Sequence, residues 1–248
     1  MKKILAACIV AAAFCAPAFA ADMPVKAPVS TPAAFDWSGF YVGGSLGYQD
    51  PRIKLVNPNF PASAIQPHDP DGIYGGHIGL QKQFGAFVLG VEGGLQDSFL
   101  RSGGNVACNG PNAGLAPGIP ANCQARMKDV WTIGGRAGWA AGNWMPYISG
   151  GYANGAFDYH AISLAGSTFE QAKTRLGGSY IGGGLDWMLS PHWTLGVEYR
   201  HYQFDHKLAS AFGTGGGGFP AGVFTEPVQF GAKADTVSAR LSYRWGWM

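Results

Sequence analysis

Residues 193–204 alternate apolar with polar or charged side chains, and this pattern limits the possible folds more than any other feature of the chain. In an extended strand, successive side chains point to opposite faces. Glu198 and Arg200 therefore share one face with Thr194, Gly196 and Tyr202. The residues on the opposite, apolar face are Leu195, Val197 and Tyr199. The segment is predicted to be a strand with one apolar face and one charged face.

The first twenty residues have the features of a secretory signal peptide. Lys2 and Lys3 precede an apolar run that ends in the small-aromatic-small sequence Ala18-Phe19-Ala20. We expect cleavage after this site, a periplasmic tether over residues 21–36 and a barrel over residues 37–248. In an exported chain the apolar strand faces are expected to contact lipid, so the charged faces line the interior of a closed barrel.

Composition narrows the class of protein further. Removal of the signal leaves fifteen basic and fifteen acidic residues, and a neutral chain argues against nucleic acid as a partner. The mature chain has no run of eighteen apolar residues, so no spanning helix is predicted. The chain contains 39 glycines and only 13% charged residues, a composition that suits many short strands in a membrane barrel.

Eight segments carry the alternation, and the connections between them are long and short in turn. The predicted strands are residues 37–48, 73–83, 87–96, 130–140, 146–155, 176–188, 193–204 and 236–247. The predicted long connections are 49–71, 97–128, 156–173 and 205–234, and the short ones are 84–86, 141–145 and 190–192. Long surface loops and tight periplasmic turns over an even number of strands are typical of outer-membrane barrels. The predicted fold is all-β: an eight-stranded antiparallel transmembrane β-barrel with four long extracellular loops and three short periplasmic turns.

Six charged side chains fall on the predicted inward faces at similar heights above the periplasmic turns. They are Glu92, Arg136, Asp186, Glu198, Arg200 and Arg240. The interior of an eight-stranded barrel is just wide enough for side chains to fill it, so these opposite charges should pair in a lumen charge network. A selectivity ring in a narrow pore is the alternative interpretation.

Catalysis is not predicted. Residues 43–47 match the G-x-S-x-G pattern of hydrolases, but that motif needs a sharp turn from a strand into a helix. Here Ser45 lies within an alternating strand with no helical pattern after it. No resident cofactor or metal is predicted either.

Two cysteines remain after removal of the signal, Cys108 and Cys123, in a segment rich in Gly, Pro and Asn. In an exported chain such a pair most simply forms one loop disulfide. A zinc site would need further Cys or His ligands at close spacing, and the neighbouring sequence has none.

Four motifs in sequence order resemble the small outer-membrane immunogenic proteins of alphaproteobacteria. They are FDWSGFYVGG at residues 35–44, GVEG at 90–93, PYISGG at 146–151 and WTLGVEY at 193–199. The resemblance spans residues 37–245 and implies an eight-stranded barrel, loosely related to the transmembrane domain of OmpA, in the outer membrane of a Gram-negative cell. The family usually ends on an aromatic residue, whereas Met248 follows Trp247 here.

The resemblance implies a non-enzymatic protein that contributes to envelope structure and to contacts at the cell surface. Its implied partners are outer-membrane lipid and lipopolysaccharide, the barrel-assembly machinery, and host or surface ligands that bind the loops. Some relatives are called porins or hemin-binding proteins, which leaves two alternatives: a small-solute channel and a loop-based hemin receptor. Candidate heme-iron ligands for the receptor are His68, His160 and His206, all in predicted surface loops.

Overall fold

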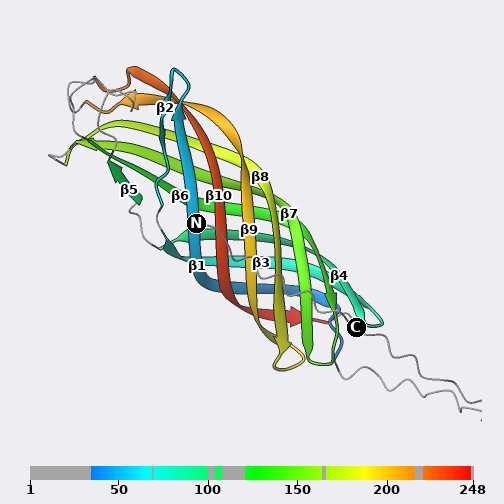
Figure 1. Ribbon diagram of the computed structural model, residues 1–248. Coiled ribbons are helices and arrows are strands. Elements are labelled where there is room, and N and C mark those ends of the chain that lie inside the picture. Colours follow the sequence, from blue (N-terminus) through cyan, green and yellow to red (C-terminus); the bar gives the residue numbers. More distant parts are fainter. Residues whose placement is uncertain are drawn as a thin grey trace, which may run out of the picture. The chain divides into compact units, whose positions relative to one another are not determined.

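The computed structural model describes residues 35–68, 70–99, 104–107, 121–163, 166–215 and 220–246, which form one antiparallel sheet closed into a barrel (Figure 1). The eight strands of the ring are β1 (Gly39–Asn57), β3 (Asp71–Phe84), β4 (Phe87–Ser98), β6 (Ala121–Trp139), β7 (Trp144–Ser163), β8 (Thr168–Met188), β9 (Trp193–Gly213) and β10 (Phe224–Trp245). Two short strands, β2 (Phe60–Ile65) and β5 (Gly104–Ala107), pair with β1 and β6. Among the described residues, no helix is long and apolar enough to cross a membrane.

The ring closes where the first strand pairs with the last. β1 and β10 are paired continuously from Phe40 opposite Trp245 to Val56 opposite Gln229. The remaining neighbours follow the order β10-β9-β8-β7-β6-β4-β3-β1, so every strand of the ring has a partner on both sides. The predicted all-β fold of eight antiparallel strands is confirmed.

Tight turns join β3 to β4, β6 to β7 and β8 to β9, and they lie at the lower right of Figure 1. Two of them contain a glycine in the left-handed backbone region, Gly85 with φ 64° and Gly142 with φ 65°. Side chains other than glycine adopt such values at an energetic cost. The three predicted short turns are therefore at the expected places.

The predicted long loops are wrong in extent, because the strands continue well into them. β1 runs on to Asn57 and β7 to Ser163, while β8 already begins at Thr168. β9 continues to Gly213, and β10 begins at Phe224 rather than near Thr236. Much of what the sequence predicted as loop is thus the distal half of the barrel wall.

The reason for this difference is visible along β10, whose two faces exchange chemistry partway along the strand. In the distal half Val228, Phe230 and Ala232 point inward and are buried, and Lys233 is exposed. In the half near the tight turns the inward residues are Thr236, Ser238, Arg240, Ser242 and Arg244, and the outward ones include Val237, Leu241 and Tyr243. The alternation continues with the opposite polarity. A pattern of apolar outward faces therefore predicts only the half of the strand near the tight turns.

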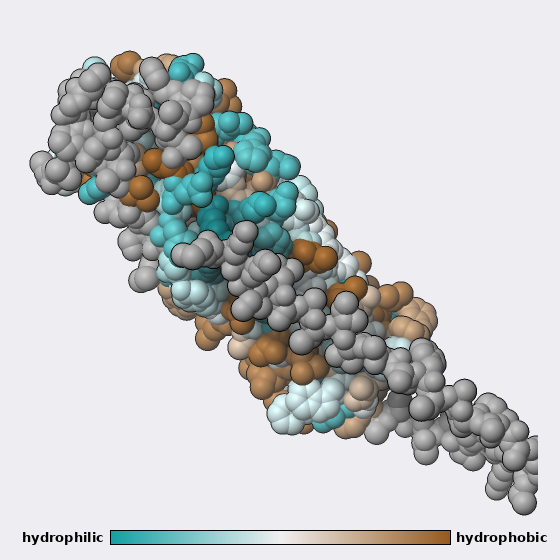
Figure 2. Space-filling view, in the orientation of Figure 1, coloured by the Kyte–Doolittle hydropathy of each residue, from teal (hydrophilic) through white to brown (hydrophobic). Residues whose placement is uncertain are grey.

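The half of the barrel with the apolar outer face is the membrane-spanning part. Its exposed side chains include Leu46, Ile78, Val91, Ile133, Ile148, Ile181, Val197 and Val237, with Trp131, Trp139, Trp187, Trp193 and Trp245 among the aromatic residues. On the face drawn in Figure 2, hydrophobic residues gather toward the end with the tight turns, and hydrophilic residues lie over the middle. A membrane strand needs roughly 9–11 residues, whereas β10 has 22. The distal half therefore projects beyond the bilayer, and we call it the extracellular extension (residues 49–57, 121–129, 155–163, 168–177, 203–213 and 224–235).

This orientation predicts which ends of the barrel are accessible on intact cells. Ala221 lies in the turn between β9 and β10, and Ala141 lies in the turn between β6 and β7; both are exposed. A maleimide that does not cross the membrane should label Ala221→Cys on intact cells and Ala141→Cys only after lysis. Mass spectrometry of labelled peptides would identify the site, and the reverse pattern would contradict the orientation.

Candidate functional site

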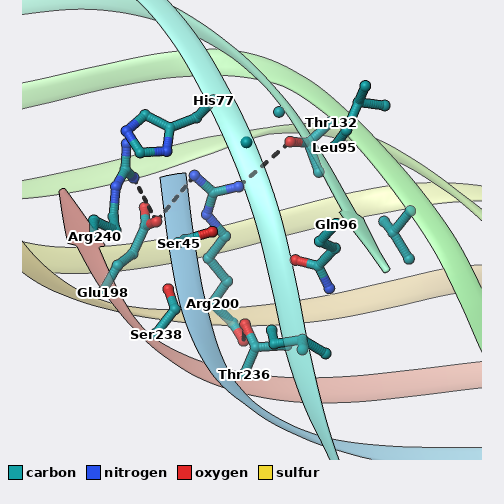
Figure 3. A pocket seen from close by; sticks show the side chains of 14 residues that line it. Ser45, His77, Leu95, Gln96, Thr132, Glu198, Arg200, Thr236, Ser238 and Arg240 are labelled. Carbon is teal, nitrogen blue, oxygen red and sulfur yellow. Dashed lines mark hydrogen bonds and ion pairs between the residues drawn. The ribbon is translucent and has the colours of Figure 1, made fainter. Parts of the chain in front are cut away.

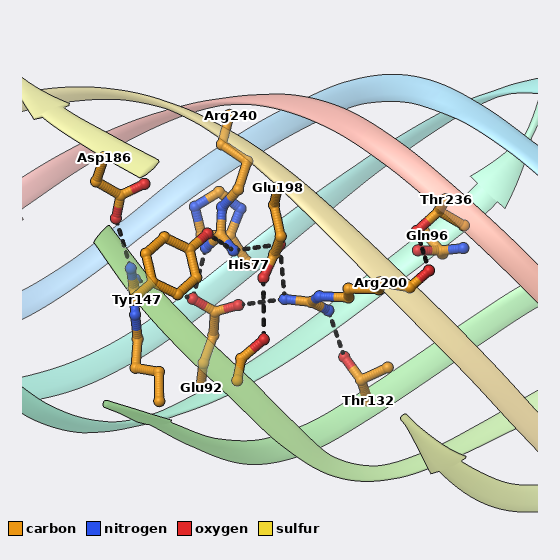
Figure 4. A network of polar contacts seen from close by, with 12 residues as sticks. His77, Glu92, Gln96, Thr132, Tyr147, Asp186, Glu198, Arg200, Thr236 and Arg240 are labelled. Atoms are coloured by element: carbon orange, nitrogen blue, oxygen red, sulfur yellow. Dashed lines mark hydrogen bonds and ion pairs between the residues drawn. The ribbon is translucent and has the colours of Figure 1, made fainter. Parts of the chain in front are cut away.

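The centre of the barrel, at the level of the membrane, holds a network of ion pairs that crosses the lumen (Figure 4). Glu92 on β4 is its hub. The Glu92 carboxylate lies 2.5 Å from Arg240 Nη2, 2.7 Å from Arg200 Nη2 and 3.5 Å from Arg136 Nη1. One carboxylate thus contacts arginines from three other strands, β6, β9 and β10.

The other two carboxylates complete the network. Asp186 on β8 lies 2.5 Å from Arg136 Nη2. Glu198 lies 2.5 Å from Arg240 Nη1 and 3.0 Å from Arg200 Nη2. The structure thus brings together all six charged residues that the sequence placed in the lumen, and each of the six is buried.

Neutral side chains extend the network to β1 and β7, and a histidine of β3 lies beside it. Tyr41 on β1 donates a hydrogen bond to Glu92 at 2.8 Å, and Ser149 on β7 donates one to Glu198 at 3.3 Å. His77 on β3 lies 2.7 Å from the hydroxyl of Ser242. Alternation along the predicted strands places these neutral side chains on inward faces as well, but only the six charged residues were predicted to form the network.

The arginines are also held by aromatic rings. The guanidinium of Arg136 lies 3.9 Å from the ring centroid of Tyr147, and that of Arg200 lies 4.9 Å from the ring centroid of Tyr180. A cation over an aromatic face is attracted by the ring quadrupole, more so where water is excluded. These contacts fix the planes of the guanidinium groups in the lumen.

Glycines on the inward faces make room for these rings. A Cβ atom at Gly134 would lie 2.4 Å from the Tyr180 hydroxyl, and one at Gly184 would lie 2.6 Å from the Tyr147 hydroxyl. Real Cβ atoms do not approach oxygen so closely. The high glycine content is therefore explained in part by the packing of the lumen.

Charge balance keeps this buried arrangement stable. Three arginines face three carboxylates, so the network as a whole is neutral. Burying an ion is costly unless a partner and further hydrogen bonds compensate it, and removing one partner leaves a charge without compensation. The network is thus suited to filling the lumen with a fixed set of side chains.

Little space remains beside the network. A cavity of about 30 Å³ lies between Arg200, His77, Thr132 and Thr236 (Figure 3). A water molecule needs roughly 10–15 Å³ by this measure, so the cavity accommodates about two or three waters. Its volume is far too small for a solute larger than water.

A cluster of apolar side chains around Trp37 fills the end of the barrel with the tight turns. Trp37 is 1% exposed and packs with Val88, Met145, Tyr147 and Met188. Its indole Nε1 donates to the carbonyl of Gly142 at 3.2 Å, and its own carbonyl accepts from Gln81 Nε2 at 2.6 Å. The side chain thus lies inside the barrel, on the same face as Tyr41 in the predicted strand 37–48, although β1 itself begins only at Gly39.

The extracellular extension is filled by an apolar core on the other side of the network. Its largest fully buried members include Phe157, Tyr202, Phe230, Ile53 and Leu176. The rings of Phe157 and Phe204 pack edge to face with centroids 5.2 Å apart. The lumen is therefore occupied in three successive layers: the Trp37 cluster, the charged network and this extracellular core.

The three candidate heme ligands lie apart from one another. His68 is exposed and its Nε2 lies 2.5 Å from Asp50 Oδ1, beside β1. His160 is on β7, where partial burial lowers its pKa, and His206 is on β9 with its ring against Gly231. These strands are not neighbours in the sheet. In the described part of the chain, no group of three or more His, Cys, Asp or Glu residues is arranged to hold a metal ion.

The remaining predictions concern segments at the edge of the described structure. Cys123 lies on β6, is buried, and has its Sγ 3.3 Å from the Tyr159 hydroxyl. Cys108 lies outside the described residues, so the disulfide stays a prediction. Residues 1–34 and the terminal pair Trp247 and Met248 also lie outside them, and the signal, most of the tether and the C-terminal departure stay predictions as well.

Known proteins with this sequence pattern come from bacterial outer membranes. Residues 6–244 match the outer membrane protein beta-barrel domain family. The 31 kDa outer-membrane immunogenic protein of Brucella melitensis is 30% identical over 218 residues, which cover 81% of this chain and 86% of the relative. The 25 kDa outer-membrane immunogenic protein of Brucella ovis is 29% identical over 218 residues, covering 84% of this chain and 94% of the relative.

A solved structure shares the fold at low sequence identity. The outer membrane protein OprG of Pseudomonas aeruginosa superposes with a TM-score of 0.50 and 12% identity, covering 86% of this chain and 98% of that structure. At this identity the likeness concerns the barrel architecture alone.

The network predicts unequal effects for two arginine substitutions. Arg240→Leu removes the partner of two buried carboxylates, Glu92 and Glu198, and should lower the free energy of unfolding by about 3–5 kcal/mol. Arg52→Leu removes an exposed partner of Asp50 and should cost less than about 1 kcal/mol. Urea unfolding of both variants in the same lipid vesicles measures the difference, and equal losses would contradict the buried network.

Proposed function

Because this chain belongs to the outer membrane protein beta-barrel domain family, we propose that it is a non-enzymatic component of the envelope whose lumen is closed. In this proposal the membrane-spanning part anchors the protein, and the extracellular extension holds a rigid wall of strands above the lipid. The outer face of that wall is available for contacts at the cell surface.

The observation that carries the proposal is the filled lumen. Side chains from seven of the eight strands of the ring meet in the charged network and its hydrogen-bonded neighbours, and His77 on the eighth, β3, lies beside them with its ring centroid 6.2 Å from that of Tyr41. The cavity beside the network measures about 30 Å³. The Trp37 cluster and the extracellular core lie on the two sides of the network. A selectivity filter would need a continuous path for water beside its charges, so the channel alternative has less support.

The separated histidines likewise give the hemin alternative less support. His68, His160 and His206 lie on or beside three strands that are not neighbours. We therefore keep hemin binding as a third hypothesis that heme absorbance would test directly.

The outer surface supports lipid and lipopolysaccharide as the partners of the barrel wall. Directly above the apolar belt of β1 and β10, the outward side chains change to Asp50, Arg52, Lys54, Lys233 and Asp235. Charged groups at this height match the polar headgroups of the outer leaflet. The barrel-assembly machinery is a further proposed partner during insertion, as for other barrels of this type.

Planar lipid bilayers provide the test of the closed lumen. Refolded wild-type protein should give no stable conductance steps at either polarity, because the network occupies the lumen. Large, stable and ion-selective steps from the wild-type protein would overturn the proposal in favour of a small-solute channel.

A charge-balanced variant serves as the matched control for this measurement. Glu92→Ala combined with Arg240→Ala removes one charge of each sign and shortens two buried side chains that contact each other at 2.5 Å. This variant should allow measurable ion leakage if it folds, as judged by its gel mobility before and after heating. If neither protein conducts, the wild-type result still agrees with the proposal, because the proposal depends only on the conductance of the wild-type protein.

A further inference from the structure

Two carboxyl groups lie inside the apolar core of the extracellular extension, where the charged network does not reach. Glu170 on β8 is 1% exposed, and Glu226 on β10 is 7% exposed. Carboxylates are rarely buried without a cationic partner because their desolvation is costly. In the described structure no salt bridge reaches either residue, so these two groups need another explanation.

Each carboxyl group has one neutral hydrogen-bond donor. The Thr225 hydroxyl donates to Oε1 of Glu170, and Asn57 Nδ2 on β1 donates to Oε2 of Glu226 at 2.5 Å. Oε2 of Glu170 is buried, and no described residue forms a hydrogen bond to it. A buried carboxyl oxygen without a donor is costly when it carries charge and much less so when the group is protonated.

The titratable neighbours do not supply a positive charge. On β7, burial and the charges of both carboxyl groups raise the pKa of the Tyr159 hydroxyl, and Cys123 Sγ on β6 lies 3.3 Å from that hydroxyl. Arg126 and Lys128 on β6 form ion pairs with Asp158. Burial and the neighbouring Glu170 raise the pKa of Glu226 to about 7, and burial raises the pKa of Glu170 although the Thr225 hydrogen bond opposes this.

Backbone pairing between β8 and β9 is interrupted near this pair. The β8–β9 ladder is continuous from Met188 opposite Thr194 to Gly178 opposite Phe204, and it resumes only at Gln171 opposite Phe212. Between these two parts of the ladder, residues 172–177 of β8 and 205–211 of β9 are not paired with each other. We call this interruption the seam between β8 and β9. Across the seam, Lys207 Nζ donates a hydrogen bond of 3.3 Å to the carbonyl of Arg175.

The carboxyl pair lies at the distal end of the seam. Glu170 pairs with Gly213 in the short distal part of the β8–β9 ladder, and its hydrogen bond from Thr225 connects β8 to β10 across the end of β9. Glu226 is next to Thr225 and is connected to β1 through Asn57. The two carboxyl groups thus join three strands around the part of the wall that lacks backbone pairing.

We propose that protonation of the buried Glu170 and Glu226 keeps the extracellular end of the barrel closed, and that loss of the proton to solvent loosens the seam between β8 and β9. Two ionised carboxylates repel each other in an apolar core, and opening the seam lets water reach them. No bond other than the O–H bond breaks, and the proton goes to water or buffer. This device concerns the extracellular extension and does not depend on whether the membrane-level lumen conducts.

The sign of the pH dependence follows from the direction of the shifts. A carboxyl group whose pKa is higher in the folded state than its ordinary value of 4.5 favours folding at low pH. That stabilisation is progressively lost as the pH rises from about 4.5 through about 7. The closed end is therefore the acidic form, and the loosened end is the alkaline form.

Hydrogen exchange measured by mass spectrometry tests the proposal on the full barrel in detergent micelles. Between about pH 5.5 and about pH 8.5, and after correction for intrinsic exchange rates, protection of residues 172–177 and 205–211 should fall at least tenfold, since one unit of pKa corresponds to a tenfold change. Peptides from residues 193–200 should keep their protection. Absence of the fall in the wild-type protein would overturn the proposal.

Matched variants assign the effect to the pair. Glu226→Gln keeps the size and hydrogen bonding of the side chain but cannot ionise, so the fall should disappear; Glu170→Gln provides the same test if the first variant does not fold. Asp205→Asn, which changes an exposed carboxylate on the same seam, should keep the wild-type profile. A wild-type profile in both Gln variants would overturn the proposal. Restoration of protection at high pH by calcium chloride in the wild type, but not in Glu226→Gln, would also overturn it in favour of a metal site.

Discussion

Closure of the sheet is the constraint on which the rest of this structure depends. Hydrocarbon offers no hydrogen bonds, so each backbone N–H and C=O in the bilayer needs a partner within the protein. The continuous pairing of β1 with β10 provides the last set of partners and removes the sheet edges. Once the ring is closed, every strand has one face toward the surroundings and one toward a narrow interior, and this division decides which residues each position accepts.

The surroundings change along the strands, and the side chains change with them. At the level of the membrane, lipid lies outside, so apolar residues face outward and the ion pairs around Glu92 occupy the interior. In the extracellular extension, water lies outside, so Lys233 and its neighbours face outward and Phe230 belongs to an apolar core. The same β10 strand therefore follows the rules of a membrane barrel in one half and those of a soluble barrel in the other.

This exchange explains what the sequence did and did not predict. Side-chain alternation, as in residues 193–204, together with the positions of the tight turns predicted the membrane strands and the inward position of Arg136. It did so because apolar residues face outward throughout the membrane-spanning half. The extracellular strands were predicted as loops because their alternation has the opposite polarity. The partners of Trp37 and Glu170 come from distant parts of the chain, as in the hydrogen bond from Thr225 to Glu170, and spacing along one strand does not determine such contacts.

A double-mutant cycle on Arg136 and Asp186 tests the central claim most directly, because their side chains meet at 2.5 Å across the lumen from β6 and β8. Each single substitution to Leu leaves its partner buried without that charge, whereas the double variant removes both charges together. If the lumen is filled by a paired network, the free energies of unfolding should show a coupling of about 2–3 kcal/mol between the two positions. Additive effects, within about 0.5 kcal/mol, would mean that the two charges do not depend on each other and would contradict the network.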